Sequence, residues 1–111
     1  MFCGLKLLVA GWKQWKAGMR TLAAQPNIVA KISGLGMLDN GWTVESLRPL
    51  VLESLEAFGP ERAMFASNFP VDKLFSSYAA VWQAFDAITA DLSAGERDSL
   101  FRGTAKRIYR L

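Results

Sequence analysis

The chain has 111 residues, with 13 Lys and Arg against 10 Asp and Glu, no histidine, one cysteine and 51% hydrophobic residues. This composition predicts a packed core and excludes a disordered chain, while the lone Cys3 excludes an internal disulfide framework and a multi-thiolate zinc site. The absence of histidine removes the commonest general base near neutral pH, and the single cysteine favours a reducing, cytoplasmic setting.

The first half of the chain predicts a helix, a strand and a second helix. The apolar residues that recur at steps of three and four are Leu8, Trp12, Trp15, Met19 and Leu22. Pro26 ends this helix, and residues 28–33 form a β-branched strand that runs into a glycine loop. Thr43 is the N-cap of the next helix, and Trp42 is placed to pack on Leu47. Pro49 marks either a later start of this helix or a kink.

The second half predicts another strand and two more helices. Residues 63–68 form a short apolar strand that Pro70 cuts off, and Ser76 or Ser77 caps the helix that follows. Ser93 and Glu96 have the spacing of a capping box, so a last helix begins near residue 94. The residues expected on its inward face are Leu100, Phe101, Ala105, Ile108 and Leu111.

This order of elements predicts an α/β fold. Two strands separated by one helix form a βαβ unit, which requires a parallel pair and a right-handed crossover. Parallel sheets normally have more than two strands and are covered on both faces, so the chain is expected to be part of a larger α/β sheet or barrel. No apolar run approaches the roughly 20 residues needed to cross a bilayer, and no membrane partner is expected.

A basic cluster lies at the end of the chain, formed by Arg102, Lys106, Arg107 and Arg110. Such a cluster can bind phosphate groups, or it can complement the dipole at a helix C-terminus. No recognition motif or aromatic stacking platform accompanies it, so no nucleic-acid partner is expected.

Functional groups of α/β proteins lie at the carboxyl ends of the strands, which here supply two pairs of candidates. Strand alternation places Lys31 and Ser33 on the polar face of the first strand, where they are candidates for substrate binding. Alternatively, Lys31 pairs with an acid inside a barrel as a structural element. Asn68 and Asp72 follow the second strand and are the candidate catalytic residues. Asp72 is either a general base or an N-cap of the following helix.

Four segments together resemble the C-terminal part of the amidohydrolase-related TIM-barrel hydrolases, a branch that includes sugar lactonases. The segments are residues 15–19, 27–35, 64–72 and 101–111. The resemblance implies that the chain is a C-terminal fragment, residues 1–111, of a single amidohydrolase-type barrel domain. It would be an incomplete TIM barrel comprising the last two parallel strands with flanking helices.

The resemblance also implies an activity, namely hydrolysis of a lactone or another cyclic ester or amide by water attack on a carbonyl. The substrate would be a small molecule, and the fragment alone would be inactive. In the family an aspartate followed by an aromatic residue and proline ends the eighth strand, whereas here Asn68 occupies that position. A carboxamide cannot take a proton at neutral pH, so Asp72 would have to replace that base.

Cofactor and partner expectations follow from the same resemblance. Family members differ in whether they use a divalent metal, and no metal ligand or cofactor is assigned to this histidine-free chain. The sequence leaves the oligomeric state open. The alternative is a small α/β protein-interaction module without catalytic activity, whose strand edges and Trp-rich helices bind a partner chain.

Overall fold

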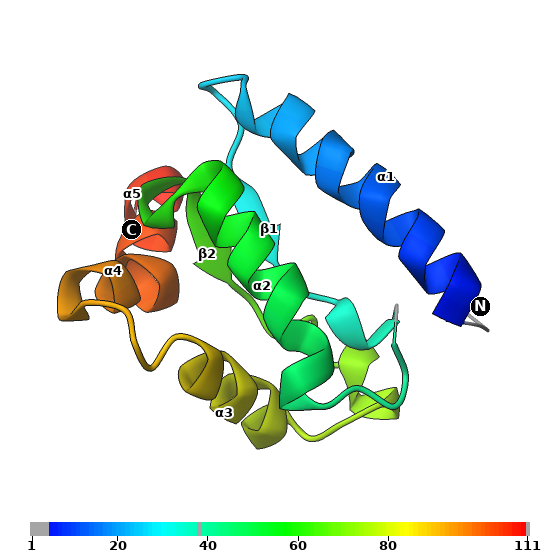
Figure 1. Ribbon diagram of the computed structural model, residues 1–111. Coiled ribbons are helices and arrows are strands. Elements are labelled where there is room, and N and C mark those ends of the chain that lie inside the picture. Colours follow the sequence, from blue (N-terminus) through cyan, green and yellow to red (C-terminus); the bar gives the residue numbers. More distant parts are fainter. Residues whose placement is uncertain (1–4, 38, 111) are drawn as a thin grey trace.

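The computed structural model describes residues 5–37 and 39–110, with side chains from residue 11 onward, so Cys3 and Leu111 lie outside the described residues. Its helices and strands follow one another in the predicted order (Figure 1). They are α1 Leu5–Ala23, β1 Ala30–Ile32, α2 Val44–Phe58, β2 Ala63–Phe65, α3 Tyr78–Ile88, α4 Ala94–Asp98 and α5 Thr104–Tyr109. None of the helices in the described ranges is long and apolar enough to span a membrane.

The two strands form a parallel sheet, which confirms the βαβ unit. Ala30 pairs with Ala63 and Ile32 with Phe65, and the ladder extends by one hydrogen bond from the Ala66 N–H to the Ile32 carbonyl (3.1 Å). Both strands are shorter than the predicted ranges of 28–33 and 63–68. The left-handed backbone of Asn68 (φ 57°) is incompatible with a strand, so the predicted last residue of the second strand lies outside it.

The core lies between one face of this sheet and the helices. Ile32 and Phe65 are buried on that face, and the Phe65 ring stacks on Phe85 of α3 at 4.2 Å. Figure 1 shows α2 lying across the two strands, where Val51 is fully buried. Lys31, between Ala30 and Ile32 in β1, is exposed. The predicted alternation of this strand, apolar side toward the helices and Lys31 on the other side, is therefore confirmed.

The helix starts follow the capping signals in the sequence. The Thr43 hydroxyl accepts a hydrogen bond from the Ser46 N–H (3.1 Å), and the Ser46 hydroxyl accepts one from the Thr43 N–H (2.8 Å). Ser93 and Glu96 form the predicted capping box at α4. Of the two candidate caps for α3, Ser77 is the one used. Pro49 lies inside α2, which begins five residues earlier. Proline has no N–H, so the helix lacks the hydrogen bond that residue 49 would normally donate to the Glu45 carbonyl.

The last helix is interrupted, which corrects its predicted inward face. A π-helical segment, η4 Ser99–Gly103, joins α4 to α5. A π turn holds one extra residue, so the following residues are rotated around the axis relative to a regular helix. Thr104 is consequently buried, and its hydroxyl donates to the Pro60 carbonyl (2.7 Å). Leu100 is buried as predicted, whereas the prediction for Ile108 is wrong, because its side chain is 39% exposed.

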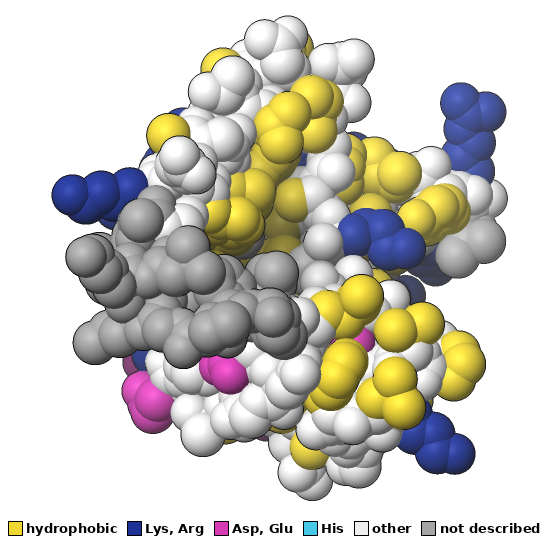
Figure 2. All heavy atoms as spheres, turned by 90° about the vertical axis from the view of Figure 1, so that its right-hand side faces the viewer, with side chains coloured by type: hydrophobic (Ala, Val, Ile, Leu, Met, Phe, Trp, Pro, Cys, Tyr) yellow, Lys and Arg dark blue, Asp and Glu magenta, His cyan; other side chains and the backbone are white. Residues whose placement is uncertain are grey.

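The first helix is attached to α2 by charged groups. Glu53 is buried on α2, and its carboxylate accepts hydrogen bonds from Arg20 of α1 (Nε–Oε2 2.8 Å). Several large apolar side chains remain exposed elsewhere, and Figure 2 shows groups of hydrophobic side chains on one face of the molecule. Four of these exposed apolar residues lie in the segments that follow the two strands, namely Met37, Val71, Leu74 and Tyr78.

Candidate functional site

Two loops meet at the carboxyl ends of β1 and β2. The loop after β1 contains a short 3-10 turn, η1 Leu35–Met37, and the loop after β2 contains another, η3 Val71–Leu74. The Nδ2 atom of Asn68 lies 3.3 Å from the Met37 sulfur, so the two loops are in contact. Because the strands are parallel, their carboxyl ends lie at the same edge of the sheet, and this brings residues 31 apart in sequence, such as Met37 and Asn68, into contact.

Asn68 and Asp72, the two candidate catalytic residues, are directly hydrogen-bonded. The Asn68 amide donates to Oδ1 of Asp72 at 2.9 Å, and the Asp72 N–H donates to the Asn68 carbonyl at 3.0 Å. Asp72 is only 3% exposed. A carboxylate can only accept hydrogen bonds, so the amide nitrogen of Asn68 must face it. The pair therefore consists of one buried carboxylate and one neutral donor.

Two glycines make room for this pair. Gly34 has a left-handed backbone (φ 68°), and a Cβ placed on it would lie 3.3 Å from Asn68 Nδ2. A Cβ on Gly36 would lie 3.3 Å from the indole ring of Trp42 and 3.5 Å from Oδ2 of Asp72. The sequence identified this segment only as a loop, since close approach of a backbone to a side chain 30 or more residues away has no local signal.

The structure rejects the alternative role of Asp72 as a helix cap. The N-cap of α3 is Ser77, whose hydroxyl accepts the Ala80 N–H at 3.0 Å. Asp72 lies instead within η3, where its backbone carbonyl accepts the N–H groups of Phe75 and Ser76. Its side chain turns back toward Asn68, so the carboxylate is not used to cap any helix that the structure describes.

The two candidate substrate-binding residues are separate from this pair. Lys31 is exposed in the middle of β1, and Ser33 is half-buried just after the strand. Among the described residues, no hydrogen bond or ion pair joins either of them to Asn68 or Asp72. The structural alternative for Lys31, an acid partner inside a barrel, likewise stays a prediction.

The basic cluster at the end of the chain is partly neutralised by its own surroundings. Arg102 forms an ion pair with Asp98 (3.2 Å), and Arg107 donates a hydrogen bond to the Glu61 carbonyl. Lys106 and Arg107 lie in the last turn of α5. These contacts favour the interpretation in which the cations complement a helix C-terminus.

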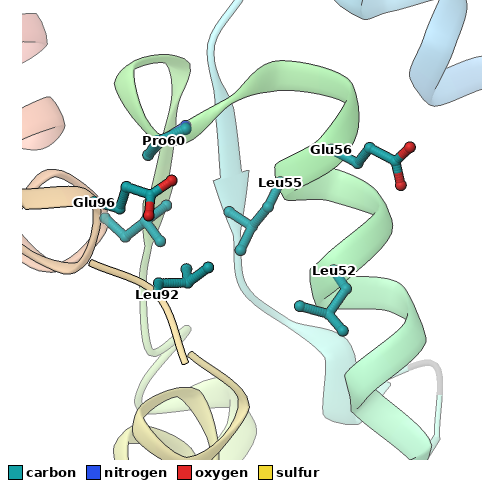
Figure 3. A pocket seen from close by; sticks show the side chains of 7 residues that line it. Leu52, Leu55, Glu56, Pro60, Leu92 and Glu96 are labelled. Carbon is teal, nitrogen blue, oxygen red and sulfur yellow. The ribbon is translucent and has the colours of Figure 1, made fainter. Parts of the chain in front are cut away.

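A cavity of about 340 Å³ lies between α2 and the segment around α4. It is lined by Leu52, Leu55, Glu56, Pro60, Leu92, Glu96 and Leu100. Figure 3 shows leucine side chains facing this space from α2 and from the segment before α4, with the Glu56 carboxylate pointing away from it. The Ser93 N–H holds the pKa of Glu96 below its usual range by hydrogen bonding to its carboxylate. None of the lining residues belongs to the loops around Asp72, so this cavity is not the candidate site.

The fold and the Asn68–Asp72 pair define a parallel α/β protein with a polar cluster at the carboxyl ends of its strands. Enzymes of the α/β barrel and doubly wound classes place their active sites at this edge. Comparison with known proteins identifies the family. A family model described as Amidohydrolase matches residues 6–111. The chain belongs to the amidohydrolase family.

Relatives of known sequence and structure agree with this assignment. The chain is 58% identical over 97 residues to an uncharacterised protein, y4mH, of Sinorhizobium fredii, covering 87% of this chain and 33% of that protein. It is 38% identical over 106 residues to an L-fucono-1,5-lactonase of Burkholderia multivorans, and the match covers 88% of this chain and 36% of that protein. The crystal structure of an amidohydrolase from Burkholderia multivorans with bound HEPES superposes with a TM-score of 0.84 at 39% identity. This match covers 89% of this chain and 37% of that structure. The chain thus spans about a third of the length of these relatives.

The described residues do not by themselves fit a metal ion. Another crystal form of the Burkholderia multivorans amidohydrolase contains bound zinc. In the described part of this chain, no group of three or more His, Cys, Asp or Glu residues is arranged to hold a metal, and the sequence has no histidine. The Asn68–Asp72 pair offers one carboxylate and one amide oxygen, fewer ligands than zinc sites use. We therefore derive no catalytic step through a metal.

Proposed function

We propose that this chain forms the last two strand–helix units of an amidohydrolase-type barrel that hydrolyses a lactone or another cyclic ester or amide. Three findings support the proposal. The chain covers 37% of a related amidohydrolase structure with a TM-score of 0.84, and a relative that is 38% identical is a lactonase. Among the residues that the structure describes, no further strand pairs with either edge of β1–β2, and the remaining strands of a barrel would add there.

The observation that carries the proposal is the buried Asp72 carboxylate at the carboxyl end of the sheet, held by the Asn68 amide. A carboxylate in this position can act as general base, whereas the Asn68 carboxamide cannot accept a proton at neutral pH. Asp72 thus takes the place of the acid that the family resemblance puts at position 68.

The reaction begins when a water molecule attacks the carbonyl carbon of the lactone. One O–H bond of the water breaks, its proton moves to Asp72, and a new C–O bond forms while the carbonyl electron pair moves onto oxygen. The oxyanion then re-forms the carbonyl, the bond to the ring oxygen breaks, and this oxygen takes the proton from Asp72. Donors that face the oxyanion would lower the barrier of the first step. Lys31 and Ser33, on the polar side of β1, would contact the substrate.

A chimeric enzyme tests this function. The chain replaces the matching third of the Burkholderia multivorans L-fucono-1,5-lactonase, and hydrolysis of L-fucono-1,5-lactone and a panel of other lactones is followed by acid release. We expect turnover by the chimera and none by the 111-residue chain alone. The intact lactonase is the positive control. A folded chimera that hydrolyses none of the lactones would contradict the proposal and favour the protein-interaction module.

The role of Asp72 is tested in the same chimera. Asp72→Asn keeps the size of the side chain and removes the base, so kcat should fall by a factor of about 100 to 10,000. The matched control is Lys73→Ala, which truncates the exposed neighbour of Asp72 in η3 and should leave kcat unchanged. If the chimera is active and Asp72→Asn leaves kcat unchanged, the function stands and the base must lie elsewhere.

A further inference from the structure

The turn that carries Asn68 fixes the side chain of this residue in one orientation. Its backbone is left-handed (φ 57°), a conformation that asparagine adopts more readily than most residues. The Asn68 carbonyl accepts the Asp72 N–H at 3.0 Å, and the Asn68 amide donates to Asp72 Oδ1 at 2.9 Å. Two hydrogen bonds therefore join the same two residues, one through the backbone and one through the side chains.

The loop after β1 packs against the two ends of this pair. Nδ2 of Asn68 also lies 3.3 Å from the Met37 sulfur, and Gly34 leaves the space that the amide occupies. Gly36 borders the other end, where its missing Cβ would lie 3.5 Å from Oδ2 of Asp72. Among the described residues, Asn68 is the hydrogen-bond donor to Oδ1, and no second donor contacts Oδ2. The two carboxylate oxygens thus have different surroundings.

We propose that Asn68 is a positioning residue, which holds Oδ1 of Asp72 so that Oδ2 is the atom that accepts the proton of water. The inference rests on the proposed function and deepens it, because it assigns a task to the residue that departs from the family pattern. An aspartate at position 68 would be an acceptor facing an acceptor at neutral pH, and two like charges at this distance repel each other. A neutral donor is what a base at position 72 requires.

The test uses variants of the lactonase chimera. Asn68→Gly removes the amide but tolerates the left-handed backbone, so it separates positioning from backbone strain. We expect kcat to fall by about 10- to 100-fold with KM changed less than about twofold, because misplacement of a reacting group by about 1 Å has effects of this size. Asn68→Asp should also lower kcat, and Lys73→Ala is again the control.

A double variant distinguishes positioning from a general structural role. If Asn68 acts through Asp72, adding Asn68→Gly to Asp72→Asn should cause no further loss of kcat, whereas independent effects would multiply. An unchanged kcat in Asn68→Gly, a multiplied loss in the double variant, or a faster Asn68→Asp enzyme would each overturn the proposal.

A measurement that needs no turnover separates this inference from the proposed function. The side-chain amide of Asn68, observed by ¹⁵N NMR in the chimera, should shift when Asp72→Ala removes the acceptor. Lys73→Ala should leave the same signal in place. An unchanged Asn68 amide in Asp72→Ala would overturn the positioning role whether or not the chimera is active. A shifted amide in an inactive chimera would support the Asn68–Asp72 hydrogen bond. It would contradict only the proposed hydrolase function.

Discussion

Arg62 joins segments that are far apart in the sequence, and its replacement tests the packing that places β2. Nη1 donates to the carbonyls of Gln25 (3.0 Å) and Ile28 (3.2 Å), and Nη2 donates to that of Ala23 (2.9 Å). The guanidinium also lies over the Phe58 ring, 5.3 Å from its centroid. One side chain therefore ties the end of α1 and the approach to β1 to η2 Pro60–Arg62, directly before β2.

Arg62→Met keeps an apolar stem and removes all three hydrogen bonds. Charge-assisted hydrogen bonds contribute about 1.5–3 kcal/mol each, but Arg62 is only partly buried and water can reach the freed carbonyls. We therefore expect a loss of about 2 kcal/mol in the free energy of unfolding. In a barrel domain this corresponds to a fall of about 4–8 °C in Tm. Arg62→Lys keeps the charge but lacks the planar guanidinium, so its Tm should lie between that of the unsubstituted protein and that of Arg62→Met.

Thermal unfolding of the chimera, followed by circular dichroism, measures this loss. The matched control is Arg102→Met, which removes another arginine from an exposed ion pair with Asp98 and should change stability by less than about 0.5 kcal/mol. If Arg62→Met melts at the same temperature as Arg102→Met, the three carbonyl contacts do not hold α1 against η2, and the reasoning fails.

Three further predictions concern stability and association. The isolated chain should elute as several species and melt without a steep transition, because in the described part of the chain neither outer edge of β1–β2 has a partner strand; a sharp monomer peak would contradict this. Leu100→Ala should lose about 2–5 kcal/mol of stability, while Leu52→Ala, 40% exposed on the same cavity, should lose less than about 1 kcal/mol; equal losses would disprove the core assignment. Hydrogen bonding lowers the Glu96 pKa, so its capping contribution is present above the usual glutamate range and is lost as the pH falls through the folded-state value. Hydrogen exchange at α4, corrected for intrinsic rates, should show this loss, and Glu96→Gln should abolish it; the Thr43 capping box, without a titratable group, is the control.

The sequence predicted the helices well because their signals are local. Thr43, Ser77 and the Ser93–Glu96 pair bond to backbone groups within three residues, so the spacing along the chain already contains the geometry. The alternation of β1 was also predictable, since side chains of a strand alternate strictly between its faces. These features need no knowledge of the rest of the fold.

The errors arose where distant residues decide the structure. The π segment rotates the last helix so that Thr104 reaches the Pro60 carbonyl, 44 residues away, and Ile108 turns outward. Glu53 and Arg62 gave no signal in the sequence, because their partners lie 33 and 34–39 residues away. A helical period cannot predict an inserted residue, and a charged side chain does not show by itself whether it is buried.

The candidate site was predictable in its composition but not in its geometry. Asn68 and Asp72 were identified as neighbours at a strand end, yet the structure alone shows that the amide faces the carboxylate. The supporting residues Gly34, Gly36, Met37 and Trp42 come from the other loop. Their contribution depends on the parallel register of β1 and β2, which brings both loops to the same edge.

The Asn68–Asp72 pair also limits which residues this turn can hold together. A left-handed residue at position 68 favours Asn, Asp or Gly, and only Asn can donate a hydrogen bond to a carboxylate at neutral pH. A carboxylate at position 72 that is 97% buried needs such a donor, because an unpaired buried charge is strongly unfavourable. Asn68 and Asp72 are therefore best understood as one unit.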